Sequence, residues 1–270
     1  MRPVGQAGRD ITLLPQDDRA AFRLPVMRFL LPLSLSLAAC CFVGGLRAEA
    51  PATQAKSFDS EITIKLGYHY LLTLPDGYGA DKAKEWPLLI FLHGAGERGD
   101  NLELLKKHGP PKLIAAGKKF EAIVVSPQVP NGEFWNPHGV KALVDQVKKD
   151  YRVDANRVYL TGISMGGFGT FDTITAYPDV FAAAVPICGG AGVNVVKFGP
   201  LKDMPIWMFH GAKDPVVPVE FTGMAEKWFK RNGGGAKVKV TIYPEAQHDS
   251  WTPTYDNAEM WTWLFQQSRK

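Results

Sequence analysis

Short runs of apolar residues recur along the chain from Phe58, and each has the length and the β-branched or aromatic content of a strand. The uninterrupted run 87–92 (PLLIFL) is typical of a central strand that is covered on both faces. Residues 237–243 alternate between polar and apolar side chains, which favours a position nearer the edge of a sheet. The predicted strands of this set are 87–92, 122–126, 158–161, 182–187, 206–209 and 237–243.

Helical patterns separate these strands. Upstream of them, residues 61–65 and 68–74 lie on either side of Gly67 and predict an antiparallel hairpin. Strands that alternate with helices predict an α/β fold with a mostly parallel sheet and helices on both faces. In such a sheet, ligands bind at the carboxyl ends of the strands. The predicted helices are 101–105 with a further piece near Leu113, 140–149, 165–176, 219–231 and 257–267.

The first fifty residues have a different character and are predicted to be an N-terminal extension with a signal peptide, followed by a globular domain over 51–270. Met27 and an arginine precede the apolar run 29–39, which is too short for a good membrane-spanning helix. Met27 is therefore the expected start, and export is the expected fate. The segment 37–40 (LAAC) resembles a bacterial lipobox and would lipidate Cys40, whereas residues 48–50 (AEA) offer ordinary cleavage. A buried N-terminal helix is the alternative.

Composition excludes some classes of function. The formal net charge of the chain is only +4, and several of its arginines lie in the extension. Because no basic stripe with interleaved aromatic residues is present, nucleic acid is not an expected partner. The spacing of His and Cys predicts no metal site. Without the extension, Cys188 would be the sole cysteine, and we expect it to pack at a strand end.

The segment 157–170 (RVYLTGISMGGFGT) reads as a strand, a sharp turn and a helix, with Ser164 at the turn. A Gly-x-Ser-x-Gly sequence in this context is typical of a nucleophile elbow, in which the serine side chain projects from the strand end. The N-terminus of the following helix would favour an oxyanion. The chain contains 27 glycines, so a plain glycine-rich loop is the alternative.

The loop 93–101 (HGAGERGDN) follows the strand 87–92 and has the pattern of an oxyanion loop. We expect the N–H groups of Ala95 and Met165 to be the two oxyanion donors. Asp100 with Glu103 is interpreted as a capping box of the next helix. Arg98 either binds a substrate carboxylate or pairs with Glu97.

Asp214 and His248 follow the two later strands 206–209 and 237–243. With Ser164 they stand in the chain order Ser, Asp, His, which is the order of an α/β-hydrolase triad. The alternative for Asp214 is a turn residue, because Asp-Pro favours turns. His210 is expected to shape the Asp214 loop.

The four segments HGAGERGDN, GISMGG, HGAKDPVVP and HDSW resemble a bacterial group of the α/β-hydrolase superfamily. This group is described as phospholipase/carboxylesterase-like, as "predicted peptidase", and as feruloyl-esterase or polyhydroxyalkanoate-depolymerase-like. The resemblance implies a mostly parallel sheet of the eight-stranded type and an α/β-hydrolase catalytic domain over 51–270. It also implies hydrolysis of carboxylic esters without a metal or an organic cofactor, with Ser164 as nucleophile, Asp214 as the acid and His248 as the base. Serine at the elbow argues against the dienelactone hydrolases, which use cysteine.

The substrate is expected to be a small-molecule or polymer-linked ester. Trp135 and Trp251 are expected to form an aromatic wall of the cleft, which would suit an aryl or sugar-linked ester, such as a feruloyl or acetyl ester of a carbohydrate. Core packing is the alternative role for these two side chains. The short, glycine-rich connection 188–204 leaves no room for a large lid. The residues expected to line the cleft are His93, Gly94, Gln128, Trp135 and Trp251.

Three alternatives stay open at this point. A serine peptidase of the prolyl-oligopeptidase type shares the hydrolase domain but usually carries a large N-terminal domain. A thioesterase or deacetylase would use the same triad. A surface-anchored binding module on a catalytically dead scaffold belongs to a different class, and the intact Ser164, Asp214 and His248 argue against it.

Overall fold

The computed structural model describes residues 54–191 and 199–269. The chain divides into two units, Met1–Ser60 and Glu61–Lys270, and every described helix and strand lies in the second unit. The predicted signal peptide, Cys40 and the predicted boundary at residue 50 lie outside the described residues. No helix in the described part of the chain is long and apolar enough to cross a lipid bilayer.

The described strands form one seven-stranded sheet in the order β1-β3-β2-β4-β5-β6-β7. Only β1 runs antiparallel to its neighbour, β3, and the other adjacent pairs are parallel. The predicted α/β class with a mostly parallel sheet is therefore confirmed. The strands are β1 (His69–Thr73), β2 (Trp86–Leu92), β3 (Ile123–Gln128), β4 (Val153–Ile163), β5 (Ala183–Ile187), β6 (Ile206–Gly211) and β7 (Val238–Tyr243).

The predicted hairpin over 61–74 is wrong. Residues 61–68 carry no strand, and β1 pairs with β3, which is more than fifty residues away along the chain. The described sheet therefore has seven strands where eight were expected. The physical reason is that alternation identifies a strand-forming segment without identifying its partner, since edge pairing depends on tertiary contacts.

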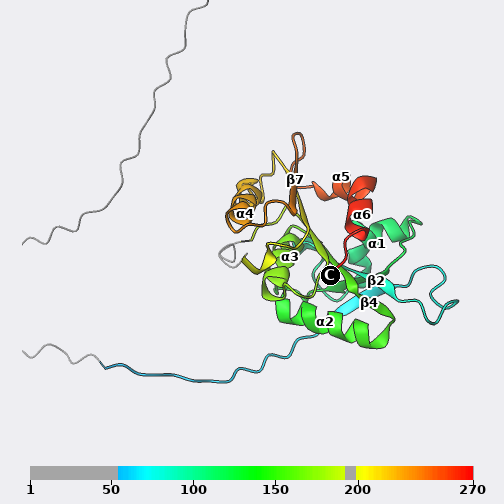
Figure 1. The fold of residues 1–270 in the computed structure, drawn as a ribbon, viewed down its shortest axis with the longest axis horizontal. Helices are drawn as coiled ribbons and strands as arrows, with labels where there is room; N and C mark the ends of the chain where they lie inside the picture. Colours follow the sequence, from blue (N-terminus) through cyan, green and yellow to red (C-terminus); the bar gives the residue numbers. More distant parts are fainter. Residues whose placement is uncertain (1–53, 192–198, 270) are drawn as a thin grey trace, which may run out of the picture. The chain divides into compact units, whose positions relative to one another are not determined.

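Helices cover both faces of the sheet, as Figure 1 shows for α2 and α3 on one side and for α1 and α6 on the other. Alternate residues of β2 point to opposite faces, so that Leu88 and Ile90 enter one apolar core and Leu89 and Phe91 enter the other. The first core packs against α2, α3 and α4, and the second packs against α1, α5 and α6. The helices are α1 (Gly109–Ala115), α2 (Pro137–Asp150), α3 (Met165–Ala176), α4 (Glu220–Arg231), α5 (Trp251–Asp256) and α6 (Ala258–Phe265).

Asparagine side chains start several of these helices. Asn136 accepts hydrogen bonds from two N–H groups of α2, and Asn257 does so for α6. Asn257 stands between α6 and a separate short helix, α5, which comes before it in the chain. The predicted helix over 257–267 corresponds to α6 alone. Asn101, rather than the predicted Asp100, caps the 3-10 helix Leu102–Lys107 through the N–H of Glu103.

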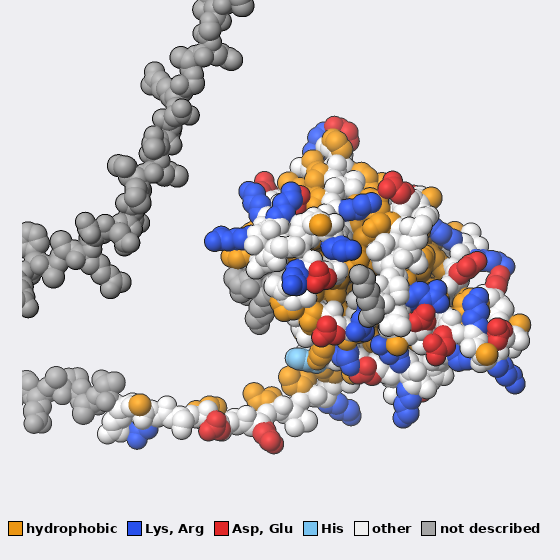
Figure 2. Space-filling view, in the orientation of Figure 1, with side chains coloured by type: hydrophobic (Ala, Val, Ile, Leu, Met, Phe, Trp, Pro, Cys, Tyr) orange, Lys and Arg blue, Asp and Glu red, His pale blue; other side chains and the backbone are white. Residues whose placement is uncertain are grey.

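The arrangement of the sheet brings four loops to one edge. These loops follow the carboxyl ends of β2, β4, β6 and β7, and they carry the residues singled out in the sequence. On the face shown in Figure 2, Lys and Arg side chains are interspersed with Asp and Glu side chains.

Candidate active site

Ser164 lies at the turn between β4 and α3 in a strained backbone conformation. Its φ of 50° and ψ of −115° are unusual for a residue with a side chain. The neighbouring glycines permit this turn, because a Cβ on Gly162 would lie 2.2 Å from Gly166 O. A Cβ on Gly166 would lie 1.9 Å from Leu92 O. The strand, turn and helix therefore form the predicted elbow geometry, and α3 begins at Met165, as predicted.

A chain of hydrogen bonds joins three side chains from separate loops. Ser164 Oγ lies 2.9 Å from His248 Nε2, and His248 Nδ1 lies 2.8 Å from Asp214 Oδ2. Because an ionised carboxylate only accepts, the proton of neutral His248 belongs on Nδ1. Nε2 is then free to accept from the serine hydroxyl. The structure thus brings together the three residues that the sequence order had paired.

The carboxylate of Asp214 is enclosed and fully satisfied by donors. Its Oδ1 accepts from the N–H groups of Val216 and Val217, at 2.8 Å and 3.0 Å. Its Oδ2 also lies 3.2 Å from Nε2 of the buried His210. Burial by itself raises the pKa of Asp214, but the hydrogen bonds from His248, Val217 and Val216 outweigh it and hold the pKa below its ordinary value. Asp214 is therefore an anion across the neutral range.

His210 holds the Asp214 loop against α4. Its Nε2 lies 2.8 Å from Val217 O, and its Nδ1 lies 2.7 Å from Thr222 Oγ1. Both neighbours of Nε2, Val217 O and Asp214 Oδ2, are acceptors, so Nε2 carries the proton. This arrangement agrees with the predicted loop-shaping role.

The two N–H groups predicted to bind an oxyanion stand at the beginnings of helices. Ala95 is the first residue of the 3-10 helix Ala95–Glu97, and Met165 is the first residue of α3. First-turn N–H groups have no partner inside their own helix. Neither of these two groups donates a hydrogen bond to any other described residue. Both N–H groups are therefore free to donate a hydrogen bond to a ligand oxygen.

Three residues predicted to line the cleft are buried and support the oxyanion loop instead. Gln128 Nε2 donates to Glu97 O and Asn101 O at 2.8 Å and 2.9 Å. The Trp135 indole donates to His93 O at 3.0 Å, and His93 Nε2 accepts from the Val129 N–H. His93, Gln128 and Trp135 are buried, and each hydrogen-bonds to a backbone group in the interior, which argues against their predicted place in the cleft wall.

His93 should make the protein less stable in acid. Burial lowers the pKa of His93 to about 4, against the raising effect of its hydrogen bond to Gly94 O. Between pH 6.5 and 4, His93 is therefore protonated in the unfolded chain but stays neutral in the folded protein. The free energy of unfolding consequently falls as the pH falls. We expect wild type to lose about 3 kcal/mol more than His93→Gln across this window, measured by urea unfolding. Equal losses in the two proteins would contradict this assignment.

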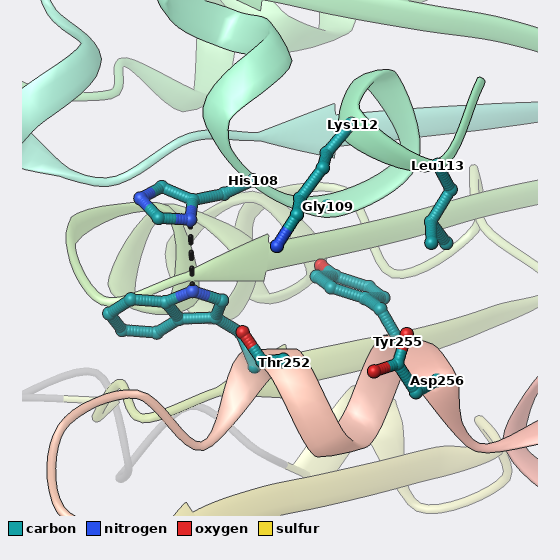
Figure 3. A pocket seen from close by; sticks show the side chains of 8 residues that line it. His108, Gly109, Lys112, Leu113, Thr252, Tyr255 and Asp256 are labelled. Carbon is teal, nitrogen blue, oxygen red and sulfur yellow. Dashed lines mark hydrogen bonds between the residues drawn. The ribbon is translucent and has the colours of Figure 1, made fainter. Parts of the chain in front are cut away.

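Gly94 and Trp251, the other two predicted cleft residues, lie beside the triad. A Cβ built on Gly94 would lie 3.7 Å from Ser164 Cβ. The ring of the half-buried Trp251 meets the His248 ring edge-on, with 5.3 Å between centroids. Trp251 also donates its indole N–H to His108 Nδ1 at 3.2 Å, and this bond is drawn in Figure 3. His108 and Trp251 border a pocket between α1 and α5.

Sequence reasoning missed Glu97 and His108 as residues of the site. His108 Nε2 lies 3.7 Å from Glu97 Oε1, and the Glu97 side chain is 92% buried, with an exposed fraction of 8%. Arg98 does not pair with Glu97 as one alternative proposed, because it donates to Ala95 O and Glu133 O. An acidic residue in a glycine-rich loop before the first helix was the available signal for Glu97.

Cys188 also lies close to the triad. Its sulfur, an Asp214 oxygen and a His248 nitrogen all lie within 4.8 Å of one another. Burial raises the pKa of the Cys188 thiol to about 12, so the sulfur keeps its proton in the neutral range. We interpret Cys188 as a packed residue behind Ser164, as the sequence predicted.

Comparison with known proteins shows that the chain is similar to esterases. A family model described as phospholipase/carboxylesterase matches residues 136–262. The chain is similar to a bifunctional acetylxylan esterase/xylanase of Neocallimastix patriciarum, at 34% identity over 48% of this chain and 20% of that protein. It is 27% identical to a probable feruloyl esterase C of Aspergillus terreus, over 62% of this chain and 63% of that protein.

A solved structure supports the same relationship. The crystal structure of a thermostable esterase superposes with a TM-score of 0.62 at 35% identity, and the match covers 74% of this chain and 59% of that one. The chain spans less than two thirds of the length of each of these relatives. The resemblance predicted from the four motifs is confirmed.

Proposed function

Because the chain has the α/β-hydrolase fold and resembles the phospholipase/carboxylesterase family, we propose that it is a serine hydrolase that cleaves carboxylic esters. The observation that carries the proposal is the hydrogen-bonded series from Ser164 through His248 to Asp214. In this proposal Ser164 is the nucleophile, His248 the general base and acid, and Asp214 the group that orients the imidazole.

The proposed reaction proceeds through an acyl-enzyme. Ser164 Oγ attacks the ester carbonyl carbon while its proton moves to His248 Nε2. The tetrahedral oxyanion accepts hydrogen bonds from the N–H groups of Ala95 and Met165. His248 then gives its proton to the leaving alcohol as the ester C–O bond breaks. Water attacks the acyl-enzyme by the same route, releases the acid and restores the serine hydroxyl.

Matched ester and amide substrates test this function. We expect the purified protein to hydrolyse p-nitrophenyl acetate in preference to the corresponding p-nitroanilide, and to act on feruloyl or acetyl-xylan esters, as the names of its relatives indicate for those proteins. A serine-directed phosphonate should label Ser164 and abolish the activity. A preference for the anilide would favour a peptidase, and the absence of labelling and turnover on all of these substrates would overturn the proposal.

The site is proposed to be open, without activation at a lipid surface. The connection from β5 to β6 is short, and residues 192–198 within it lie outside the described part of the chain. We expect simple saturation kinetics, with turnover of p-nitrophenyl butyrate exceeding that of an emulsified long-chain triglyceride, because a short connection cannot carry a helical cap. A sharp rise in rate as a substrate passes its solubility limit would show that another segment forms a lid.

We further propose that the protein is exported and anchored through a lipid on Cys40. Cys40→Ser should then move the protein from the membrane fraction to the soluble exported fraction of a bacterial host, because the acyl chains are attached to that sulfur. Cys41→Ser is the matched control and should leave the protein in the membrane fraction. A soluble exported wild type beginning near Ala48 would favour ordinary cleavage, and a cytoplasmic full-length product would refute export.

A further inference from the structure

The carboxylate of Glu97 is buried beside the proposed nucleophile without a hydrogen-bond donor. Within the part of the chain that the structure describes, no N–H or O–H group hydrogen-bonds to either oxygen, and His108 Nε2 lies 3.7 Å from Oε1. A carboxylate in this state is unfavourable, since burial removes most of its water and no described donor hydrogen-bonds to it instead. Neither oxygen is completely enclosed, so a ligand can reach them.

The Glu97 carboxylate is held close to Ser164. Gln128 Nε2 donates to the Glu97 carbonyl oxygen at 2.8 Å and fixes the backbone of the loop. A Cβ built on Gly94 would lie 3.2 Å from Glu97 Oε2 and 3.7 Å from Ser164 Cβ. The carboxylate and the serine therefore flank the same point in the site, and the glycine leaves this point open.

His108 and Trp251 connect Glu97 to the side of the site on which His248 lies. The Trp251 indole only donates, so His108 Nδ1 is the acceptor and the proton of neutral His108 lies on Nε2, toward Glu97. Figure 3 shows the His108 ring and its hydrogen bond at one wall of the pocket. Trp251 packs edge-on against His248. Because His248 protonates the leaving alcohol in the proposed mechanism, this side of the site faces the alcohol part of the ester.

We propose that Glu97 is a specificity-determining residue that accepts a hydrogen bond from a second hydroxyl group on the leaving alcohol. The preferred substrates are then monoesters of diols or polyols. This inference rests on the proposed ester hydrolysis and adds the chemistry of the alcohol to it. A hydroxyl group supplies the donor that Glu97 lacks without placing a second ion in the site. An anionic alcohol would be repelled by the same carboxylate.

An isosteric pair of acetate esters tests the inference. Propyl acetate and 2-hydroxyethyl acetate differ only by a terminal methyl or hydroxyl group. We expect the full-length wild-type protein to prefer 2-hydroxyethyl acetate by about tenfold or more in kcat/KM, which is the range expected for a hydrogen bond to a charged group. In Glu97→Gln this ratio should fall at least several-fold, and in Glu97→Leu it should approach one. The exposed residue Glu103 provides the matched control, Glu103→Gln, in which the ratio should stay as in wild type.

The ratio of the two substrates separates this inference from the proposed function. Hydrolysis of both esters that requires Ser164, with a wild-type ratio near one, would overturn the role of Glu97 and leave the esterase intact. An unchanged ratio in a folded Glu97→Gln protein would overturn it equally. If neither ester nor p-nitrophenyl acetate is hydrolysed, the proposed function fails and this inference fails with it. If both Glu97 variants fail to fold, the ratio of kcat/KM for the two esters in the wild-type protein still tests the inference.

Discussion

Replacing Ser164 by alanine should lower kcat for p-nitrophenyl acetate by about 10⁴ to 10⁶ while leaving the fold intact. The magnitude follows from the cooperation of nucleophile and base, since His248 has no proton to accept once the hydroxyl is gone. Alanine meets the same backbone restriction at φ 50° as serine does, so the elbow gains no new strain. The change removes one hydrogen bond, to His248 Nε2, and the free energy of unfolding should change by about 1 kcal/mol or less.

Two measurements accompany this variant. Steady-state kinetics give kcat, and thermal unfolding shows whether the protein remains folded. Ser268→Ala, which removes an exposed hydroxyl near the C-terminus, is the matched control and should keep the activity of wild type. A folded Ser164→Ala protein with turnover within tenfold of wild type would show that the reaction uses a different nucleophile.

Most of the sheet could be predicted because its strands are buried on both faces. A short, continuous apolar run such as PLLIFL in β2 is typical of a strand that is covered on both faces. A parallel sheet also needs helical crossovers of the kind that α2 and α3 supply. The first residue of α3 could be placed because the glycines around Ser164 mark the turn. The pairing of β1 with β3 could not be predicted, because the two strands are distant in the chain. Alternation of polar and apolar residues identifies a strand but not the strand that it pairs with.

The proposed triad was accessible from the sequence for a different reason. Each of Ser164, Asp214 and His248 follows a strand, and parallel strands bring their carboxyl ends to one edge. Side-chain burial was not accessible in this way. His93 follows β2, and Gln128 and Trp135 lie at and beyond the end of β3. Each of these side chains turns inward to bind a backbone group, and residue type does not reveal that direction. Glu97 was overlooked because a charged residue in a loop is ordinarily exposed.

Replacing Asp214 by asparagine should lower kcat by about 10⁴, the second large effect we expect. The amide oxygen can still accept from the Val216 and Val217 N–H groups, which places the NH₂ group where Oδ2 now meets His248. A donor at this point cannot pair with a protonated Nδ1. The proton of His248 is therefore expected to move to Nε2, where it faces Ser164 and blocks acceptance of the serine proton.

The same variant also loses the negative charge that stabilises the imidazolium of His248 during the reaction. The loss of activity should appear in kcat with labelling by a serine-directed phosphonate slowed to a similar degree, because both reactions require an activated Ser164. Asp145→Asn, on the exposed face of α2, is the matched control, since it removes only an ion pair with Lys141. A folded Asp214→Asn protein with kcat within tenfold of wild type would contradict the orienting role, because an acid elsewhere would then have to hold His248.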